Sequence, residues 1–256
     1  MTKTRSFGGN IVKKLNLQNK GKHILASGPY EYFIYKSINQ EELVINDLKS
    51  FTIFVLDKDE NCKIFVNDLK KNVNLSDSIQ VEDSNITISI RGGCATLLIA
   101  GTKAKSSLKQ GVLLSNLDSI YKVEKPWGHE LWINGEHECY ALKQIFIKAG
   151  TKTSLQYHNF KQETNVLFNG KAKLHFKKEL EIKNDNVNIK DIDSTIINPI
   201  SSIDVIPPTL HRLDAITDIL LYETSTPHLD DVIRVLDDAK RQSGRIQVEH
   251  SMHDDK

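Results

Sequence analysis

The sequence predicts an all-β protein made of two consecutive barrels or sandwiches. Segments that alternate apolar and polar residues dominate the 256-residue chain, and turn-rich pieces such as Asp57–Asn61 separate them. Short strands at this spacing are typical of β-sandwiches and barrels. One stretch, Thr102–Asn116, is rich in Lys and Ser and lacks periodic apolar residues. We therefore expect this stretch to link two β domains.

The expected strands share a two-residue period and fall into two groups. Those before the linker are Tyr30–Lys36, Phe51–Leu56, Cys62–Val66, Ser78–Val81, Asn85–Arg91 and Ala95–Ala100. Those after it are His129–Asn134, Cys139–Lys148, Ser154–His158, Glu163–Phe168, Ala172–Phe176, Ile203–Ile206, His211–Ala215 and Ile219–Thr224. The spacing of four apolar residues predicts one late helix: Leu229, Val232, Ile233 and Leu236. The expected domains are residues 1–115 and 116–240, followed by a loose polar tail at 241–256.

Composition excludes several classes of protein. The chain has 34 Lys plus Arg against 33 Asp plus Glu, which argues against a nucleic-acid or membrane-surface partner. Charged residues make up 26% and aromatic residues 7%, as in ordinary globular proteins rather than disordered ones. Three widely separated cysteines form neither a disulfide framework nor a cysteine zinc cluster. The chain is expected to be a soluble, folded protein.

The first thirty residues are basic and contain no acid before Glu31. Such a leader is compatible with an organelle transit peptide. However, it holds a single Arg and shows no amphipathic period, so we expect a solvated arm and a cytoplasmic protein.

The residues most informative about chemistry lie between Gly150 and Gly170. Gln156 and His158 are two positions apart on an expected strand, so they share a face. The next four residues can close a hairpin that returns Glu163 to that face. A second histidine, His211, opens a later strand after a proline-containing turn. An amide oxygen, two imidazoles and a carboxylate in one barrel suit a divalent metal.

The spacing of these residues resembles the first motif of the cupin family: Gly150, His158, Glu163 and Gly170. Gln156 replaces the usual first histidine of that motif. The segment IPPTLHRL, residues 206–213, is similar to the second cupin motif, with His211 as the ligand. The resemblance implies two jelly-roll barrels of the cupin type.

Within that family, the second half resembles the cupin domain of type II mannose-6-phosphate isomerases. The similar blocks are KPWGHELW at 125–132, IKAGTKTSLQYH at 147–158, HRL at 211–213 and LDDVIRVLDD at 229–238. Two residues after Glu163 depart from the family pattern, since Thr164 and Asn165 stand where His and Trp are usual. No segment resembles the nucleotidyltransferase domain of bifunctional members, so no nucleotidyl transfer is expected.

The resemblance implies metal-dependent isomerisation of an aldose and a ketose phosphate, with mannose 6-phosphate as the first candidate. The implied metal site uses Gln156, His158, Glu163 and His211. Zinc is the first expectation for the ion, with manganese, cobalt, nickel and iron as alternatives. Two rival functions stay open: a non-catalytic sugar-binding cupin and a metal-dependent oxygenase.

Two further residues are candidates for catalysis. Lys143 shares a strand face with apolar residues, where a lysine can serve in proton transfer; the alternatives are a structural ion pair with Glu163 or a side chain that reaches solvent at the strand end. Arg234 is the candidate phosphate clamp, because a guanidinium binds phosphate through two donors; the alternative is a solvated helix face. Trp127 is expected in the core rather than against a sugar, and Arg212 is expected to face away from the site.

The first half is expected to be a degenerate, metal-free barrel. An ungapped alignment of its late apolar strand with that of the second half places Ile88 where His211 stands. Without imidazoles, such an interior is expected to be a packed core. Cupins often pair through edge strands, so the resemblance also implies a homodimer.

Overall fold

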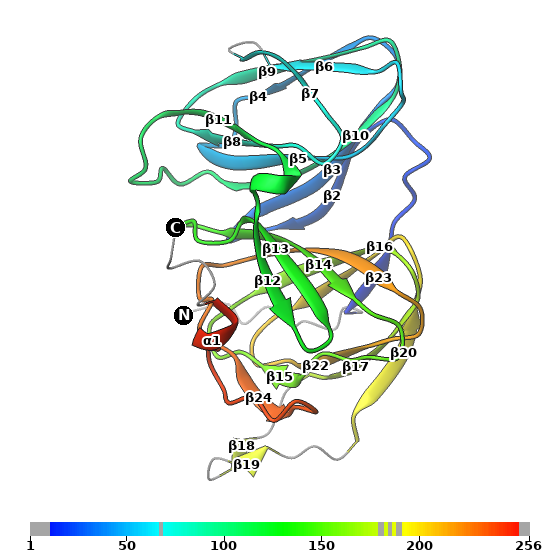
Figure 1. Ribbon diagram of the computed structural model, residues 1–256, viewed down its shortest axis with the longest axis vertical. Helices are drawn as coiled ribbons and strands as arrows, with labels where there is room; N and C mark the ends of the chain where they lie inside the picture. Colours follow the sequence, from blue (N-terminus) through cyan, green and yellow to red (C-terminus); the bar gives the residue numbers. More distant parts are fainter. Residues whose placement is uncertain (1–10, 67–68, 179–181, 184–185, 188–190, 251–256) are drawn as a thin grey trace, which may run out of the picture.

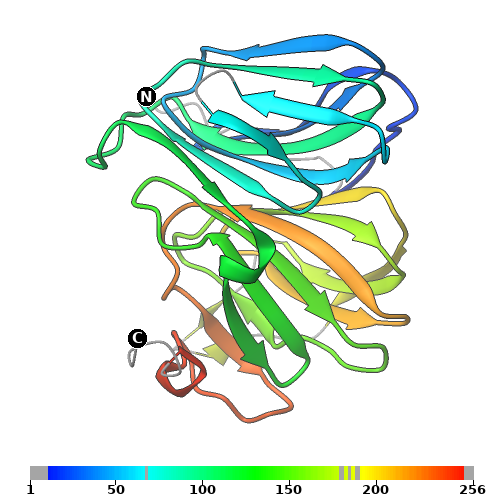
Figure 2. The ribbon, with the colours of Figure 1, turned by 45° about the horizontal axis from the view of Figure 1, so that its top comes forward.

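The computed structural model describes residues 11–66, 69–178, 182–183, 186–187 and 191–250. Strands dominate these residues, and the ribbon divides into two groups of sheets stacked along the long axis (Figures 1 and 2). The all-β prediction is therefore confirmed. No helix in the described part of the chain is both long and apolar enough to span a membrane.

The first barrel consists of a six-stranded sheet facing a four-stranded sheet. The larger sheet has the order β11-β8-β5-β10-β3-β2 and the smaller one β4-β9-β6-β7. The strands are β2 Gly21–Ser27, β3 Glu31–Ser37, β4 Glu41–Ile45, β5 Ser50–Lys58, β6 Lys63–Val66, β7 Leu69–Val73, β8 Ser78–Glu82, β9 Ile86–Arg91, β10 Ala95–Thr102 and β11 Gly111–Ser115. Apolar side chains from both sheets fill the interior, and Ile88 is among those fully buried.

The second barrel pairs a seven-stranded sheet, β1-β21-β16-β23-β14-β13-β12, with a five-stranded sheet, β20-β17-β22-β15-β24. The strands are β1 Val12–Lys14, β12 Tyr121–Lys125, β13 Gly128–Asn134, β14 Ala141–Ile147, β15 Leu155–Tyr157, β16 Glu163–Asn169, β17 Ala172–Lys177, β20 Asp193–Ile197, β21 Ser201–Val205, β22 Leu210–Ala215, β23 Ile219–Ser225 and β24 Ile233–Leu236. The short hairpin β18 Ile182–Lys183 and β19 Asn186–Val187 forms a sheet of its own. A 3₁₀ turn, Leu117–Ser119, leads into β12, and helix α1, Gln247–His250, follows β24.

Besides the core inside each barrel, an apolar cluster lies between the larger sheets of the two barrels. Tyr30, Tyr32 and Phe54 of the first barrel pack with Val166 and Tyr222 of the second. The phenol of Tyr32 donates a hydrogen bond to the Tyr222 carbonyl at 3.1 Å. The barrels are thus joined by a continuous apolar interface rather than by the connecting segment alone.

Three sequence-based expectations are wrong. The leader before Glu31 is not a solvated arm where it is described: residues 12–14 are strand β1, which pairs with β21 of the second barrel, and residues 21–27 are strand β2, which pairs with β3. Residues 1–10 lie outside the described part of the chain. The expected linker Thr102–Asn116 includes β11, which completes the first barrel by pairing with β8. No late helix forms at 229–236, because Ile233–Leu236 is strand β24 and pairs with β15. Strand β11 ends at Ser115, where the domain boundary was placed. Strand β1 lies before this boundary in the sequence but belongs to a sheet of the second barrel.

The tail expected at 241–256 is not loose in its described part. Residues 241–250 fold back onto the second barrel, and helix α1 contacts β12. Figure 1 shows α1 beside the end of β12 on this barrel. Residues 251–256 lie outside the described part of the chain.

Candidate metal centre

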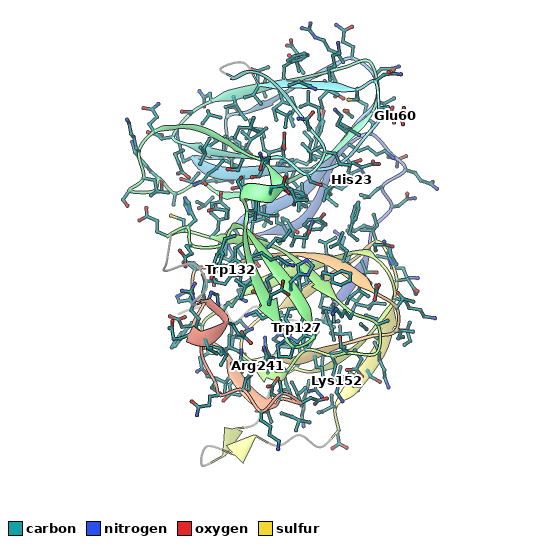
Figure 3. All side chains as sticks on the ribbon, in the orientation of Figure 1. His23, Glu60, Trp127, Trp132, Lys152 and Arg241 are labelled. Atoms are coloured by element: carbon teal, nitrogen blue, oxygen red, sulfur yellow. The ribbon has the colours of Figure 1, made fainter. Side chains whose placement is uncertain are left out.

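The cavity of the second barrel contains most of the candidate residues predicted from the sequence. It is lined by residues of both sheets and of the C-terminal segment, among them Gln156, Glu163, His211, Lys143 and Arg234. Trp127, Trp132 and Arg241, which Figure 3 labels on this barrel, also line it.

Three side chains meet at the centre of the site. Ligand atoms of His158, Glu163 and His211 lie within 4.8 Å of one another, and all three residues are buried. The Nε2 atoms of His158 and His211 are each 3.4 Å from a different carboxylate oxygen of Glu163. The hairpin between β15 and β16 returns Glu163 beside His158, as the spacing predicts.

Both imidazoles are oriented with Nε2 toward this centre. The Nδ1 atom of His158 faces the carbonyl of Asp231, and Nδ1 of His211 lies 3.0 Å from the carbonyl of Thr209. A carbonyl can only accept, so each Nδ1 carries a proton, and in the neutral ring Nε2 then presents a lone pair. Fixing the tautomer through the second nitrogen is usual for metal-binding histidines.

The surroundings of His158 Nε2 fit a divalent cation. This atom is buried and has no hydrogen-bond partner. A buried lone pair without a partner costs free energy, whereas a metal ion between the two imidazoles and Glu163 satisfies it. The donor set of two neutral imidazoles and one carboxylate suits zinc and other borderline divalent ions.

Gln156 lies next to this cluster. On β15 it pairs in register with His211 on β22. Its Oε1 accepts a hydrogen bond from Ser154 at 2.6 Å, and its Nε2 is 3.5 Å from His211 Nε2. Because the two ends of an amide are nearly isosteric, a half-turn of the amide points Oε1 at the cluster and leaves Nε2 as a donor to Ser154.

Lys161, which the sequence analysis did not select, completes the centre. Its ammonium group lies 2.6 Å from Glu163 and 2.9 Å from Glu223, and all three side chains are buried. Burial favours the uncharged amine, but the two carboxylates outweigh it and raise the pKa of Lys161 above its ordinary value. Burial likewise opposes ionisation of Glu163, yet Lys161 and the two imidazoles hold its pKa well below the usual range. The carboxylate is therefore available as a ligand at neutral pH.

Asp231 holds the hairpin that carries two of the three clustered side chains. Its carboxylate accepts backbone hydrogen bonds from Asn159, Phe160 and Lys161, at 3.1, 2.6 and 2.8 Å. Its carbonyl accepts from His158 Nδ1. One residue therefore fixes both the turn and the imidazole.

Replacing Asp231 is expected to weaken metal binding without removing a ligand. Asp231→Ala should lower zinc affinity about 10–100-fold, the usual effect of losing a group that orients a ligand. Asp231→Asn, which retains one acceptor oxygen, should fall between that variant and wild type. Competition with a chromophoric chelator measures the affinity. The neighbouring exposed Asp230 serves as the control, since its side chain makes no contact with the hairpin in the described structure. Unchanged affinity in Asp231→Ala would contradict this role.

Lys143 lies across the cavity in a second charged group. Its Nζ is 3.6 Å from Glu130 and 4.2 Å from the Trp132 ring. Lys125 lies 3.9 Å from the same carboxylate, and the Trp132 indole donates to it at 2.8 Å. Lys143 therefore pairs with Glu130 rather than with Glu163.

Glu130 gives the fold a dependence on acid. Burial alone would raise its pKa, but Lys143, Lys125 and the Trp132 indole lower it from 4.5 to about 2. A carboxyl whose pKa is lower in the folded state stabilises the fold above pH 4.5, and this contribution disappears as the pH falls toward 2. The shift corresponds to roughly 3 kcal/mol of unfolding free energy.

The pH dependence of Glu130→Gln is expected to differ accordingly. The wild-type protein should exceed the variant in urea-unfolding free energy at pH 6, and the difference should shrink between pH 5 and pH 2. A difference that stays constant over this range would show that Glu130 is not the group responsible.

Of the remaining candidates, Trp127 and Arg234 line the cavity and Arg212 does not. Arg212 faces outward, as expected, where it donates to Thr153 and Asp238. Trp127 belongs to the core of the second barrel and also lines the cavity. Arg234 lies on β24, not on a helix, and its Nη1 donates to the carbonyls of Gln242 and Gly244.

Thr164 and Asn165 separate because neighbours on a strand point to opposite faces. Asn165 lines the cavity and donates to Glu163 at 3.1 Å. Thr164 instead faces the first barrel, where its hydroxyl lies 3.1 Å from Tyr30. Of the two departures from the family pattern, only Asn165 therefore lines the cavity.

Comparison with known proteins agrees with this architecture. Residues 114–221, a little under half of the chain, match the family model described as mannose-6-phosphate isomerase C-terminal. No curated protein matches the chain. The chain has the cupin fold.

Three solved structures show how far the likeness extends. An IolB-like protein from Salmonella typhimurium is 8% identical with a TM-score of 0.62, and the match covers 95% of this chain and 99% of that one. Oxalate decarboxylase from Lactobacillus farciminis, in a formate complex, is 9% identical with a TM-score of 0.57 and 89% coverage of both chains. Salicylate 1,2-dioxygenase from Pseudoaminobacter salicylatoxidans is 11% identical with a TM-score of 0.50, covering 77% of this chain and 72% of that one. At these identities, the likeness concerns the fold across both barrels.

Proposed function

We propose that the second barrel is a metal-dependent isomerase that interconverts an aldose phosphate and a ketose phosphate. The observation that carries the proposal is one cavity holding both a His–Glu cluster and an excess of cationic groups. The match of residues 114–221 to the mannose-6-phosphate isomerase C-terminal family supports it and makes mannose 6-phosphate the first candidate substrate.

The charges that line the cavity favour an anionic substrate. Six cationic side chains line the cavity with three carboxylates: Lys125, Lys143, Lys161, Arg234, Arg241 and Arg245 with Glu130, Glu163 and Glu223. Two of these cations, Lys125 and Arg241, are also paired with carboxylates that do not line the cavity. A cleft with an excess of one sign of charge attracts ligands of the opposite sign. A phosphorylated sugar carries the negative charge that these cationic groups attract, whereas a neutral sugar does not.

The proposed metal ligands are Gln156, His158, Glu163 and His211. A divalent ion held there would act as a Lewis acid toward two adjacent oxygens of the sugar. The protein's own groups then supply the proton transfers. Isomerisation moves one proton from C2 to C1 and another between the oxygens on these carbons. We assign transfer of the carbon-bound proton to Lys143, which must act as the uncharged amine to accept it, with Glu223, which also lines the cavity, as the carboxylate alternative. Lys161 stays charged and stabilises negative charge that develops on the substrate oxygens.

The test is turnover of hexose and pentose phosphates by zinc-loaded, cobalt-loaded and manganese-loaded protein. We expect interconversion of an aldose and a ketose phosphate, loss of activity with a chelator, recovery on adding metal, and a slower reaction with deuterium at C2. Absence of interconversion across the panel would contradict the isomerase proposal. A melting shift without product would then favour a sugar-binding module, and oxygen-dependent turnover with iron would favour an oxygenase.

A further inference from the structure

The C-terminal segment 241–250 forms part of the cavity wall. Five of its residues line the cavity, together with side chains from both sheets of the barrel: Arg241, Gly244, Arg245, Ile246 and His250. This segment lies beyond the region that matches the isomerase family, which ends at residue 221. We call residues 241–250 the C-terminal strap.

The strap is attached to the smaller sheet through β24 and the residue before it. The amide of Gly244 donates to the carbonyl of Val232 at 2.8 Å. Arg234 donates through Nη1 to the carbonyls of Gln242 and Gly244, and its own amide donates to Ser243. Arg234 therefore fixes the strap backbone at the carbonyls of Gln242 and Gly244, directly before Arg245.

The other end of the strap is attached to the larger sheet. Lys125 on β12 pairs with Glu249 at 2.8 Å. The Tyr121 hydroxyl lies 2.9 Å from Nδ1 of His250, and the His250 ring packs edge-on against Trp132 at 5.0 Å between centroids. The strap thus reaches from β24 to β12 and β13 across the cavity, on the side of the barrel where Figure 3 labels Trp132 and Arg241.

The arginines of this region differ in how their donors are satisfied. Arg241 is neutralised by Asp237, at 2.8 Å, and by Glu249, at 3.3 Å. By contrast, the Nε atoms of Arg234 and Arg245 are buried and have no acceptor. A buried N–H without an acceptor is destabilising, and more so on a charged group. Both donors belong to side chains that line the same cavity, so their unmet hydrogen bonds indicate an anionic acceptor there.

The position of Arg245 suits this role. Its guanidinium lies 4.8 Å over the Trp132 ring, and Lys143 lies 4.2 Å from the same ring. The carboxylate nearest to Arg245 is Glu136, at 2.7 Å, whose side chain is 66% exposed. An exposed ion pair of this kind is weak and can exchange for a better acceptor.

We propose that Arg245 and Arg234 form a phosphate-binding subsite, with Arg245 supplied by the C-terminal strap. The identity of the whole substrate rests on the proposed function, but the subsite itself requires only a phosphate group. The strap is therefore a part of the substrate site rather than a tail.

The experiment measures binding of inorganic phosphate and of mannose 6-phosphate by calorimetry to the full-length protein. Because phosphate also ligates metals, each titration is made with zinc and again after chelation. Arg245→Ala should weaken phosphate binding at least tenfold under both conditions, while bound zinc stays at the wild-type level. Arg245→Lys should recover only part of the affinity, because an ammonium lacks the two-pronged donor geometry. The matched control is Arg91→Ala, an exposed arginine at the end of β9 in the other barrel.

Wild-type phosphate affinity in Arg245→Ala would overturn the subsite. If Arg245→Ala does not fold, Arg245→Lys with an unchanged melting temperature decides: at least threefold weaker binding supports the subsite, and equal binding overturns it. The outcomes also separate this inference from the proposed isomerase. If phosphate binding depends on Arg245 but no sugar phosphate is turned over, the subsite is retained and the isomerase is rejected. If Arg245→Ala turns over a sugar phosphate with unchanged KM, the isomerase is retained and the subsite is rejected.

Discussion

The double variant His158→Ala, His211→Ala is expected to lose its bound metal, from one ion per chain to nearly none. Both imidazoles present Nε2 to Glu163. The Nε2 atom of His158 has no hydrogen-bond partner in the described structure, and that of His211 has only a long contact of 3.5 Å with Gln156. Removing both leaves one carboxylate and an amide, which are too few strong ligands for a zinc site. His158→Ala alone should already lower affinity at least tenfold.

Metal content after dialysis, measured by mass spectrometry, checks this expectation. His175→Ala is the control, because His175 pairs with Asp214 on the barrel wall outside the cluster. That variant should keep the wild-type amount of metal. Full occupancy in the double variant would rule out this site.

Lys161→Met is expected to cost the metal-free protein about 3–5 kcal/mol of unfolding free energy. The ammonium group lies between two buried carboxylates, Glu163 and Glu223. Removing one member of a buried ionic group leaves uncompensated charge inside the protein, which is more damaging than replacing the whole group. A divalent ion at Glu163 would restore positive charge beside these carboxylates, so zinc should stabilise the variant more than it stabilises wild type.

Urea unfolding with a chelator and with excess zinc measures both effects. Lys171→Met, at an exposed position before β17, is the control for loss of a lysine. A metal-free Lys161→Met protein within about 1 kcal/mol of wild type would contradict the buried network. If zinc raised the unfolding free energy of both proteins equally, Lys161 would not interact with the metal site.

The cupin motif predicted which side chains meet, because side chains alternate between the two faces of a strand, so the spacing of residues in the sequence indicates which of them share a face. Gln156 and His158 share a face, and the hairpin returns Glu163 beside them. Lys161 precedes Glu163 by two positions, but it lies in the hairpin before β16 begins, so the strand period does not place its side chain. It was missed because a lysine in a hairpin usually points to solvent.

Tertiary pairing explains the expectations that failed. Leu229, Val232, Ile233 and Leu236 have helical spacing, but β15 offers an unpaired edge, and residues 233–236 fill it as β24. The strap has no periodic apolar pattern, because ion pairs and backbone hydrogen bonds hold it in place. The ion pair between Lys125 and Glu249 joins residues 124 positions apart, so no local pattern in the sequence reveals it.

The central claim is a single metal site in the second barrel and none in the first. Crystals grown with zinc or cobalt, and measured at the absorption edge of the metal, locate the ion directly by its anomalous scattering. We predict one peak per chain, within bonding distance of His158, Glu163, His211 and the amide of Gln156. A peak in the first barrel, or no peak at this cluster in metal-saturated crystals, would contradict the account.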